Sequence, residues 1–303
     1  MNPAASDYPS ADCPGPDPAP RRPRIPLPPG TVDCHAHVFP AALRGRMVPE
    51  RSYTTPPAEP EAYLAMLRTL GVARTVQVNA SVYGADSTPT LELMKVLGPD
   101  RARGVVGLGS DPDRGELERL HQAGVRGARV STHVQGYGGT DRLSAIAEAI
   151  APVGWHLQIH LERSSELAEL EALLLRLPVP LVFDHMGRVR GDEGVSAPGF
   201  QALRRLMLAR DDVWAKVSSF YRLSAAGAPA YGDMRPIVEE LVATRPDRLV
   251  WGTNWPHPIW HGPMPNDGDL VDLLMEWLPD PAVRRRIFAE NPAALYGFDP
   301  WRE

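Results

Sequence analysis

Four of the nine histidines stand at places where imidazole groups could meet in one reactive centre. His35 and His37 are separated by one residue in an apolar run, and His160 and His185 each close a later run of β-prone residues. A neutral imidazole can bind a metal ion, accept a proton or donate an N–H group to a carbonyl oxygen. The remaining five include four that we interpret as packed or surface residues: His121, His133, His156 and His261.

Basic side chains at comparable places could bind an acidic substrate. Arg129 ends one β-prone run and Arg222 follows another, and a guanidinium group can hold a carboxylate through two parallel hydrogen bonds. The alternative for each arginine is a structural salt bridge. Lys216 closes a further run, and we expect it to pair with Asp33 in the interior of the fold.

Short β-prone runs alternate with helical segments from residue 31 onward, as in a parallel sheet with helices on its faces. The expected strands are 31–37, 73–79, 104–108, 127–131, 156–161, 180–185, 213–218 and 248–254. The expected helices are 61–70, 89–97, 115–123, 141–151, 165–175, 198–208, 233–244 and 269–290, the last broken at Pro279. This pattern predicts the α/β class and a single (β/α)₈ TIM barrel, with the active site at the carboxyl ends of the strands.

A doubly wound open sheet is the alternative architecture. It would carry a glycine-rich turn after its first strand, and that place is taken here by His35-Ala36-His37. Alternation along the first strand predicts that Asp33, His35 and His37 point into the barrel, and that Cys34 points outward into apolar packing.

The composition separates a tail from the barrel. Ten of the 33 prolines lie in the first 30 residues, so we expect residues 1–30 to be a disordered or extended tail and residues 31–303 to be the barrel domain. A net charge of −5 argues against nucleic acid or an anionic membrane as a partner. No stretch approaches the ~20 apolar residues of a membrane helix. The two cysteines cannot form a disulfide scaffold, which favours a cytoplasmic location.

Three motifs resemble those of a known family. Residues 32–37 are VDCHAH, residues 184–187 are DHMG, and residues 251–258 are WGTNWPHP. With these motifs the chain resembles the amidohydrolase superfamily, and more narrowly its branch of 2-pyrone-4,6-dicarboxylate lactonase and related sugar and sulfo-lactone hydrolases. The resemblance extends from Thr31 to Phe298 and implies a (β/α)₈ fold and hydrolysis at a carbonyl carbon.

The resemblance also assigns roles to individual residues. The catalytic residues would be His35, His37, His160, His185 and Asn254. The substrate-binding residues would be Tyr53, Ser81, Tyr83, Arg129, Arg222 and His257. Two positions depart from the superfamily pattern. Arg129 stands in place of a metal-bridging lysine, which argues against a binuclear centre. Asn254 stands where an aspartate is usual, and an amide accepts no proton and is a weak, neutral ligand.

Three hypotheses follow. In the first, a hydrolase opens a small carboxylated lactone in the catabolism of aromatic or sugar acids and requires no cofactor. One of His37, His185 and His257 would supply the base, while Asn254 holds the water or the lactone carbonyl. In the second, one zinc ion held by His35, His37 and either His160 or His185 activates water in a mononuclear hydrolase or a non-oxidative decarboxylase. In the third, the barrel binds carboxylates without catalysis. The lactone and the oligomeric state are left open.

Overall fold

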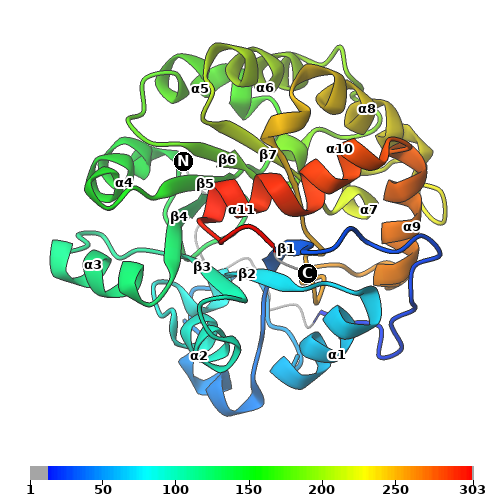
Figure 1. Cartoon of the computed structure of the whole chain (residues 1–303). Coiled ribbons are helices and arrows are strands. Elements are labelled where there is room, and N and C mark those ends of the chain that lie inside the picture. The colour runs from blue at the N-terminus through cyan, green and yellow to red at the C-terminus, as the bar shows by residue number, and fades with distance from the viewer. Residues whose placement is uncertain (1–12, 302–303) are drawn as a thin grey trace.

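The computed structural model of the chain describes residues 13–301. Eight parallel strands form one sheet in which each strand pairs with the next one along the chain (Figure 1). The strands are β1 (Val32–Ala36), β2 (Arg74–Val78), β3 (Ala102–Val106), β4 (Val125–Ser131), β5 (His156–His160), β6 (Leu181–Phe183), β7 (Val213–Val217) and β8 (Leu249–Trp251). This order, with a helix in each connection, confirms the predicted (β/α)₈ barrel.

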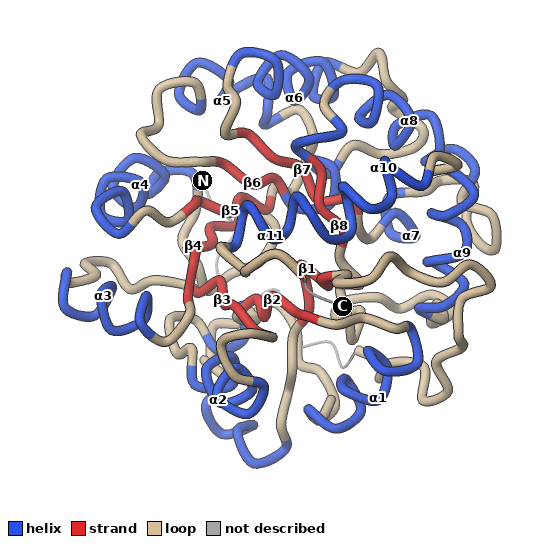
Figure 2. Tube along the Cα trace, in the orientation of Figure 1, coloured by secondary structure: helices blue, strands red, loops and turns tan. Residues whose placement is uncertain are grey.

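The helices surround the barrel as an outer layer (Figure 2). They are α1 (Pro60–Leu70), α2 (Thr88–Leu97), α3 (Arg114–Gln122), α4 (Leu143–Ile150), α5 (Glu166–Leu174), α6 (Pro198–Ala209), α7 (Phe220–Leu223), α8 (Arg235–Thr244), α9 (Asp267–Trp277), α10 (Pro281–Arg285) and α11 (Asn291–Tyr296). Helix α11 lies across one end of the barrel (Figures 1 and 2). There the ring of its Tyr296 packs edge-on against His156 at the start of β5, with 5.3 Å between centroids. The amino-terminal end of the barrel is therefore covered.

The barrel closes where the chain beyond β8 meets β1. The Asn254 N–H donates to the His35 carbonyl oxygen at 2.7 Å, and the His37 N–H donates to the Trp255 carbonyl oxygen at 2.8 Å. Gly252 permits this approach, because a Cβ at that position would lie 2.7 Å from the backbone nitrogen of His35. Closure therefore brings the two histidines of the first strand beside Asn254.

Strand β1 departs from simple alternation. Its pairing with β2 shifts between Asp33 and Ala36, which is a β-bulge. Asp33 accepts hydrogen bonds from the Tyr63 hydroxyl of α1 at 2.9 Å and from the Thr253 hydroxyl at 2.7 Å, so it faces the outer layer. Cys34 instead packs in a cluster with Val182 and Tyr296. The predicted sides of Asp33 and Cys34 are wrong, because an extra residue in one strand reverses the faces on either side of it.

The chain from Cys13 to Gly30 runs along the barrel instead of away from it. Arg24 donates from its backbone N–H to Asp272 at 2.7 Å and from its guanidinium group to Glu276 at 2.8 Å, both on α9. The part of the expected tail before Cys13 lies outside the described residues. Within residues 13–301, no helix has the length and apolar character that crossing a membrane requires.

Candidate active site

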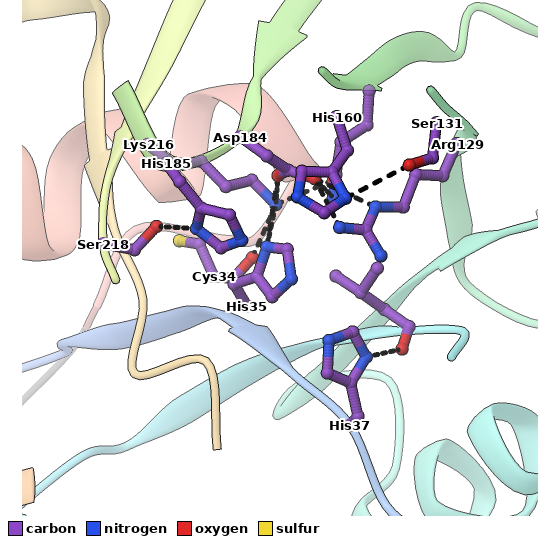
Figure 3. Close-up of polar contacts among 12 residues, drawn as sticks. Cys34, His35, His37, Arg129, Ser131, His160, Asp184, His185, Lys216 and Ser218 are labelled. Atoms are coloured by element: carbon purple, nitrogen blue, oxygen red, sulfur yellow. Dashed lines mark hydrogen bonds and ion pairs between the residues drawn. The ribbon is translucent and has the colours of Figure 1, made fainter. Parts of the chain in front are cut away.

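Four histidines from the ends of three strands, β1, β5 and β6, meet at the carboxyl end of the barrel (Figure 3). The ring of His35 lies 5.0 Å from that of His37 and 4.8 Å from that of His185, measured between centroids. His160 lies 5.3 Å from His185. All four residues are buried. The structure thus brings together the four histidines that the sequence singled out.

The chain turns sharply after β6 to bring two successive side chains to this centre. Strand β6 ends at Phe183 instead of the predicted residue 185, and His185, Met186 and Arg188 have positive φ angles of 50°, 55° and 62°. In a continuing strand Asp184 and His185 would point to opposite sides. The left-handed turn lets both reach the interior, and strained backbone of this kind is typical of functional sites.

Asp184 is the electrostatic centre of the cluster (Figure 3). Its Oδ2 accepts from Arg129 Nε at 2.9 Å, while Arg129 Nη2 lies 2.8 Å from the same oxygen. Its Oδ1 lies 3.1 Å from His35 Nδ1 and 3.6 Å from Lys216 Nζ. Lys216 therefore pairs with Asp184, and the expected pairing with Asp33 is wrong, because the bulge turns Asp33 away. Despite its burial, Arg129, His35 and Lys216 hold the pKa of Asp184 well below its usual range.

The four histidines are neutral at physiological pH. Burial lowers the pKa of His35 to about 3, and it lowers those of His37, His160 and His185 well below the ordinary value. The carboxylate of Asp184, whose Oδ1 lies 3.1 Å from His35 Nδ1, favours the tautomer of His35 with its proton on that nitrogen. The Val78 carbonyl, 2.7 Å from His37 Nδ1, does the same for His37. Both rings therefore carry a lone pair on Nε2.

His160 carries its proton on the other nitrogen. The Ser131 oxygen accepts hydrogen bonds from the backbone N–H groups of His133 and Val134, each at 3.1 Å. Its own hydroxyl proton is then directed to His160 Nδ1, 3.3 Å away. His160 consequently presents an Nε2–H donor, and this atom is buried without a hydrogen-bond partner among the described residues. A carbonyl oxygen of a substrate could accept from it.

These lowered pKa values predict that acid destabilises the barrel. The pKa of His156, like that of His35, is lowered by burial from 6.5 to about 3. Below pH 6.5 the unfolded chain binds more protons than the folded one, so the free energy of unfolding falls by up to about 1.4 kcal/mol per pH unit for each such histidine. Urea unfolding at pH 7, 6 and 5 measures this loss. His156→Gln should reduce the slope, and equal stability at all three pH values would contradict the prediction.

Two guanidinium groups lie near each other beyond the strand ends. Arg188 Nε and Arg222 Nη2 are buried atoms with no hydrogen-bond partner among residues 13–301. Burial and the charge of Arg222 lower the pKa of Arg188 to about 10, against the opposing charge of Glu162. Two cations with unused donors are chemically suited to bind an anionic group. Sequence reasoning missed Arg188, although it directly follows the DHMG motif.

Arg129 has a different setting from Arg222. It is 4% exposed, two of its nitrogens contact Asp184, and Nη1 lies 3.3 Å from the Tyr137 hydroxyl. Its charge is thus already paired, so the geometry does not favour the predicted role of Arg129 as a carboxylate clamp.

The three predicted hydroxyl donors lie together on the side of β1 and β2. The Ser81 and Tyr83 hydroxyls are buried with no hydrogen-bond partner among the described residues. The ring of Phe39 lies 6.2 Å from that of Tyr83 and 6.4 Å from that of Tyr53.

Beside this group, a cavity of about 590 Å³ opens at the end of β4. Its lining includes Ser52, Ser131, His133, Gln135 and Asp141. His133, which we interpreted as a residue outside the site, stands 5.0 Å from the ring of His160.

Asn254 and His257 are joined through a third residue. The Asn254 amide donates from Nδ2 to the Tyr221 hydroxyl at 3.0 Å, and the same hydroxyl lies 2.8 Å from His257 Nδ1. On its other side His257 Nε2 lies 3.3 Å from Asp267 Oδ1. Tyr221 and Asp267 had no assigned role in the sequence. Each of them contacts His257, and only folding brings the three residues together.

Two histidines and one carboxylate of the cluster could hold one metal ion. His35, Asp184 and His185 bring ligand atoms within 4.8 Å of one another, and the Nε2 lone pairs of His35 and His37 are of the type that zinc binds. Asp184 is already neutralised by Arg129 and Lys216, which leaves His35, His37 and His185 as the candidate ligands. His160 would first have to move its proton to Nδ1.

Comparisons with known proteins agree with this geometry. The family described as Amidohydrolase matches residues 32–298. The chain belongs to the amidohydrolase family. A 2-pyrone-4,6-dicarboxylate hydrolase of Comamonas testosteroni is 37% identical over 91% of this chain and 93% of its own length. A 4-sulfomuconolactone hydrolase of Hydrogenophaga intermedia is 33% identical over 90% of this chain and 91% of its own.

A solved structure shares the same barrel. An Agrobacterium tumefaciens protein, solved without a ligand, superposes with a TM-score of 0.81 at 29% identity, over 92% of this chain and all of the other. The family match and the two curated hydrolases confirm the predicted family membership.

Proposed function

We propose that this amidohydrolase is a hydrolase that opens the ring of a small carboxylated lactone by attack of water on the carbonyl carbon. The observation that carries the proposal is the neutral histidine cluster at the strand ends, with the unpaired donors of Arg188 and Arg222 beside it. Relatives that align over nine-tenths of the chain are named as hydrolases of a pyrone dicarboxylate and of a sulfonated lactone, both of which are anionic lactones.

Different residues bind the acidic group, the ring and the carbonyl oxygen of the substrate. Arg188 and Arg222 bind an acidic group of the substrate, while the hydroxyls of Ser81, Tyr83 and Tyr53 surround the rest of the ring. Arg129 pairs with Asp184 and therefore does not bind the substrate. The lactone carbonyl oxygen accepts from His160 Nε2–H, which stabilises the charge that develops as water attacks.

Asn254 positions the attacking water. Its Nδ2 is used by Tyr221, so its Oδ1 is the atom that accepts a hydrogen bond from the water. The amide cannot take the proton, so the base is another group. When water adds, its oxygen bonds to the carbonyl carbon, the ring C–O bond breaks, and the ring oxygen takes up a proton.

A zinc ion would supply further chemistry at this site. Bound by His35, His37 and His185, it would polarise the carbonyl or lower the pKa of a water ligand. Purified protein should be analysed for metal content and assayed with and without a chelator. Stoichiometric zinc and loss of activity on chelation would establish the zinc-dependent alternative over the cofactor-free one.

In the decisive assay the purified protein is incubated with 2-pyrone-4,6-dicarboxylate, 4-sulfomuconolactone and neutral lactones, and the products are measured by mass spectrometry. We expect the anionic lactones to gain one water. Loss of carbon dioxide would establish a decarboxylase, and unchanged substrates, with or without added zinc, would leave a binding protein. The cytoplasmic location and the division into a tail of residues 1–30 and a barrel domain of residues 31–303 stay predictions.

A further inference from the structure

The hydroxyl oxygen of Tyr221, just beyond β7, is surrounded by nitrogen atoms. Asn254 Nδ2 donates to it at 3.0 Å, and Arg222 Nε donates at 3.3 Å. His257 Nδ1 lies 2.8 Å away. Tyr221 is buried, so these contacts are not exchanged for bulk water. Three nitrogen partners around one phenol oxygen favour its anionic form over the neutral one.

His257 is itself supported by a buried carboxylate. Its Nε2 lies 3.3 Å from Asp267 Oδ1 in the first turn of α9, and both side chains are buried. The negative charge of Asp267 favours a proton on Nε2, which leaves Nδ1 to take the proton of the phenol. A carboxylate, an imidazole and a hydroxyl in this order form the arrangement that activates hydroxyl groups in many hydrolases.

Tyr221, supported by His257 and Asp267, lies beside Asn254, where hydrolysis requires a base. Asn254, which holds the water, cannot accept a proton, but its amide touches the Tyr221 oxygen. We propose that Tyr221, activated by His257 and Asp267, is the general base that removes the proton from the attacking water. The proposal rests on the lactone hydrolysis proposed above. Arg222 joins the two parts of the site, since its Nε contacts Tyr221 and its Nη2 is unpaired beside Arg188.

The step conserves atoms and charge. The phenolate oxygen of Tyr221 takes a proton from water as the water oxygen bonds to the carbonyl carbon and the carbonyl electron pair moves to its oxygen. When that pair returns, the ring C–O bond breaks and the ring oxygen leaves with the proton from Tyr221. The phenolate is regenerated, and no oxidant or second substrate takes part.

The charges around the group favour this ionisation. Burial opposes it, but the charges of His257 and Arg222 lower the pKa of Tyr221. Against the same effect of burial, Tyr221 and Asp267 raise the pKa of His257 to about 9. The neighbouring Tyr231 is affected in the opposite direction, since burial and Tyr221 raise the pKa of its hydroxyl. Tyr231 is therefore a matched control.

The first test is spectroscopic and needs no substrate. Near-ultraviolet absorption of the folded protein at about pH 8, two units below the usual pKa of tyrosine, should show one phenolate. Tyr221→Phe should remove this signal and Tyr231→Phe should keep it. His257→Gln removes a cation beside the oxygen, so the phenolate should form only at higher pH. A folded protein without phenolate absorption at about pH 8 would overturn the proposal, whatever its activity.

The second test is kinetic. Tyr221→Phe should lower kcat about 100-fold or more with little change in KM, as expected for loss of a positioned base. Asn254→Asp in the Tyr221→Phe background places a carboxylate beside the vacant position and should restore at least about tenfold of kcat. In His257→Gln the acidic limb of the kcat/KM profile should move to higher pH.

These results separate the two proposals. A wild-type protein that opens no lactone overturns the proposed function, whereas the phenolate signal is measured independently of it. If Tyr221→Phe retains full kcat on an active enzyme, or if Asn254→Asp gives no rescue, Tyr221 is not the base and the proposed lactone hydrolysis still stands.

Discussion

Asp184→Asn is expected to destabilise the barrel by about 3–5 kcal/mol, because it leaves buried cations without their counter-charge. Arg129 contacts this carboxylate through two nitrogens at 2.9 and 2.8 Å, and Lys216 Nζ lies 3.6 Å from it. The side chains of Asp184 and Lys216 are fully buried, and that of Arg129 is nearly so. Urea unfolding of the wild type and the variant at neutral pH measures the difference.

The same substitution should lower kcat by about 10³–10⁴-fold. An asparagine amide can donate to His35 Nδ1, which moves the imidazole proton to Nε2 and removes the lone pair from the reacting side. In hydrolases where a carboxylate fixes a catalytic histidine, the wrong tautomer has an effect of this order. The variant should be assayed at a temperature where circular dichroism shows that it is folded.

Glu171→Gln provides a matched control at the surface. Glu171 also holds an arginine through two contacts, at 2.7 and 2.6 Å from Arg205, but the pair is open to solvent. The same change from carboxylate to amide should have little effect there, since exposed ion pairs are screened. If both substitutions lower the free energy of unfolding equally, the burial of Asp184 does not contribute to stability.

The architecture and the histidine cluster could be predicted from the sequence, because both depend on local patterns. Hydrophobic runs and helical segments alternate from residue 31, and the carboxyl ends of parallel strands meet at one edge. His35, His37 and His160 stand at such ends, and in the structure they meet through His185, which contacts both His35 and His160. The rule fails only where the backbone departs from regular strand geometry.

Two local irregularities account for the errors. The bulge in β1 turns Asp33 toward Tyr63, and the left-handed turn after β6 gives Asp184 and His185 a common direction. Nothing in the composition of either segment fixes its φ angles, because residues other than glycine adopt positive φ only when the surrounding structure imposes it. Lys216 consequently contacts Asp184 and not Asp33.

The roles of charged residues were harder to predict for another reason. An arginine near a strand end can bind a substrate or pair with a carboxylate, and the choice depends on partners far along the chain. Arg129 is separated by 55 positions from Asp184, and Arg222 has an unpaired nitrogen only because no carboxylate lies beside it among the described residues. The linked side chains of Tyr221, His257 and Asp267 come from α7, from the chain after β8 and from the start of α9, so their contacts depend on three separate segments.

Arg188→Met is expected to raise KM for an anionic lactone about 10- to 100-fold and to change kcat little, because a hydrogen bond to a charged group contributes about 1.5–3 kcal/mol. Arg188 Nε is buried without a partner among residues 13–301, so the substitution removes a binding contact and breaks no hydrogen bond of that nitrogen. Steady-state kinetics on the free acid of the substrate and on its methyl ester measures the contribution of charge. The wild type should prefer the free acid, and the variant should lose most of this preference.

Arg190→Met is the control, because it removes the same charge two residues away. Arg190 is exposed and its guanidinium group pairs with Asp192 at 3.0 Å, so it differs from Arg188 in both burial and pairing. Its KM should stay close to that of the wild type. If both variants raise KM equally, the effect is one of general surface charge, which high salt would then abolish in both. If Arg188 forms a specific subsite, only Arg188→Met raises KM. The difference in KM should also persist in high salt, because buried groups are screened much less than exposed ones.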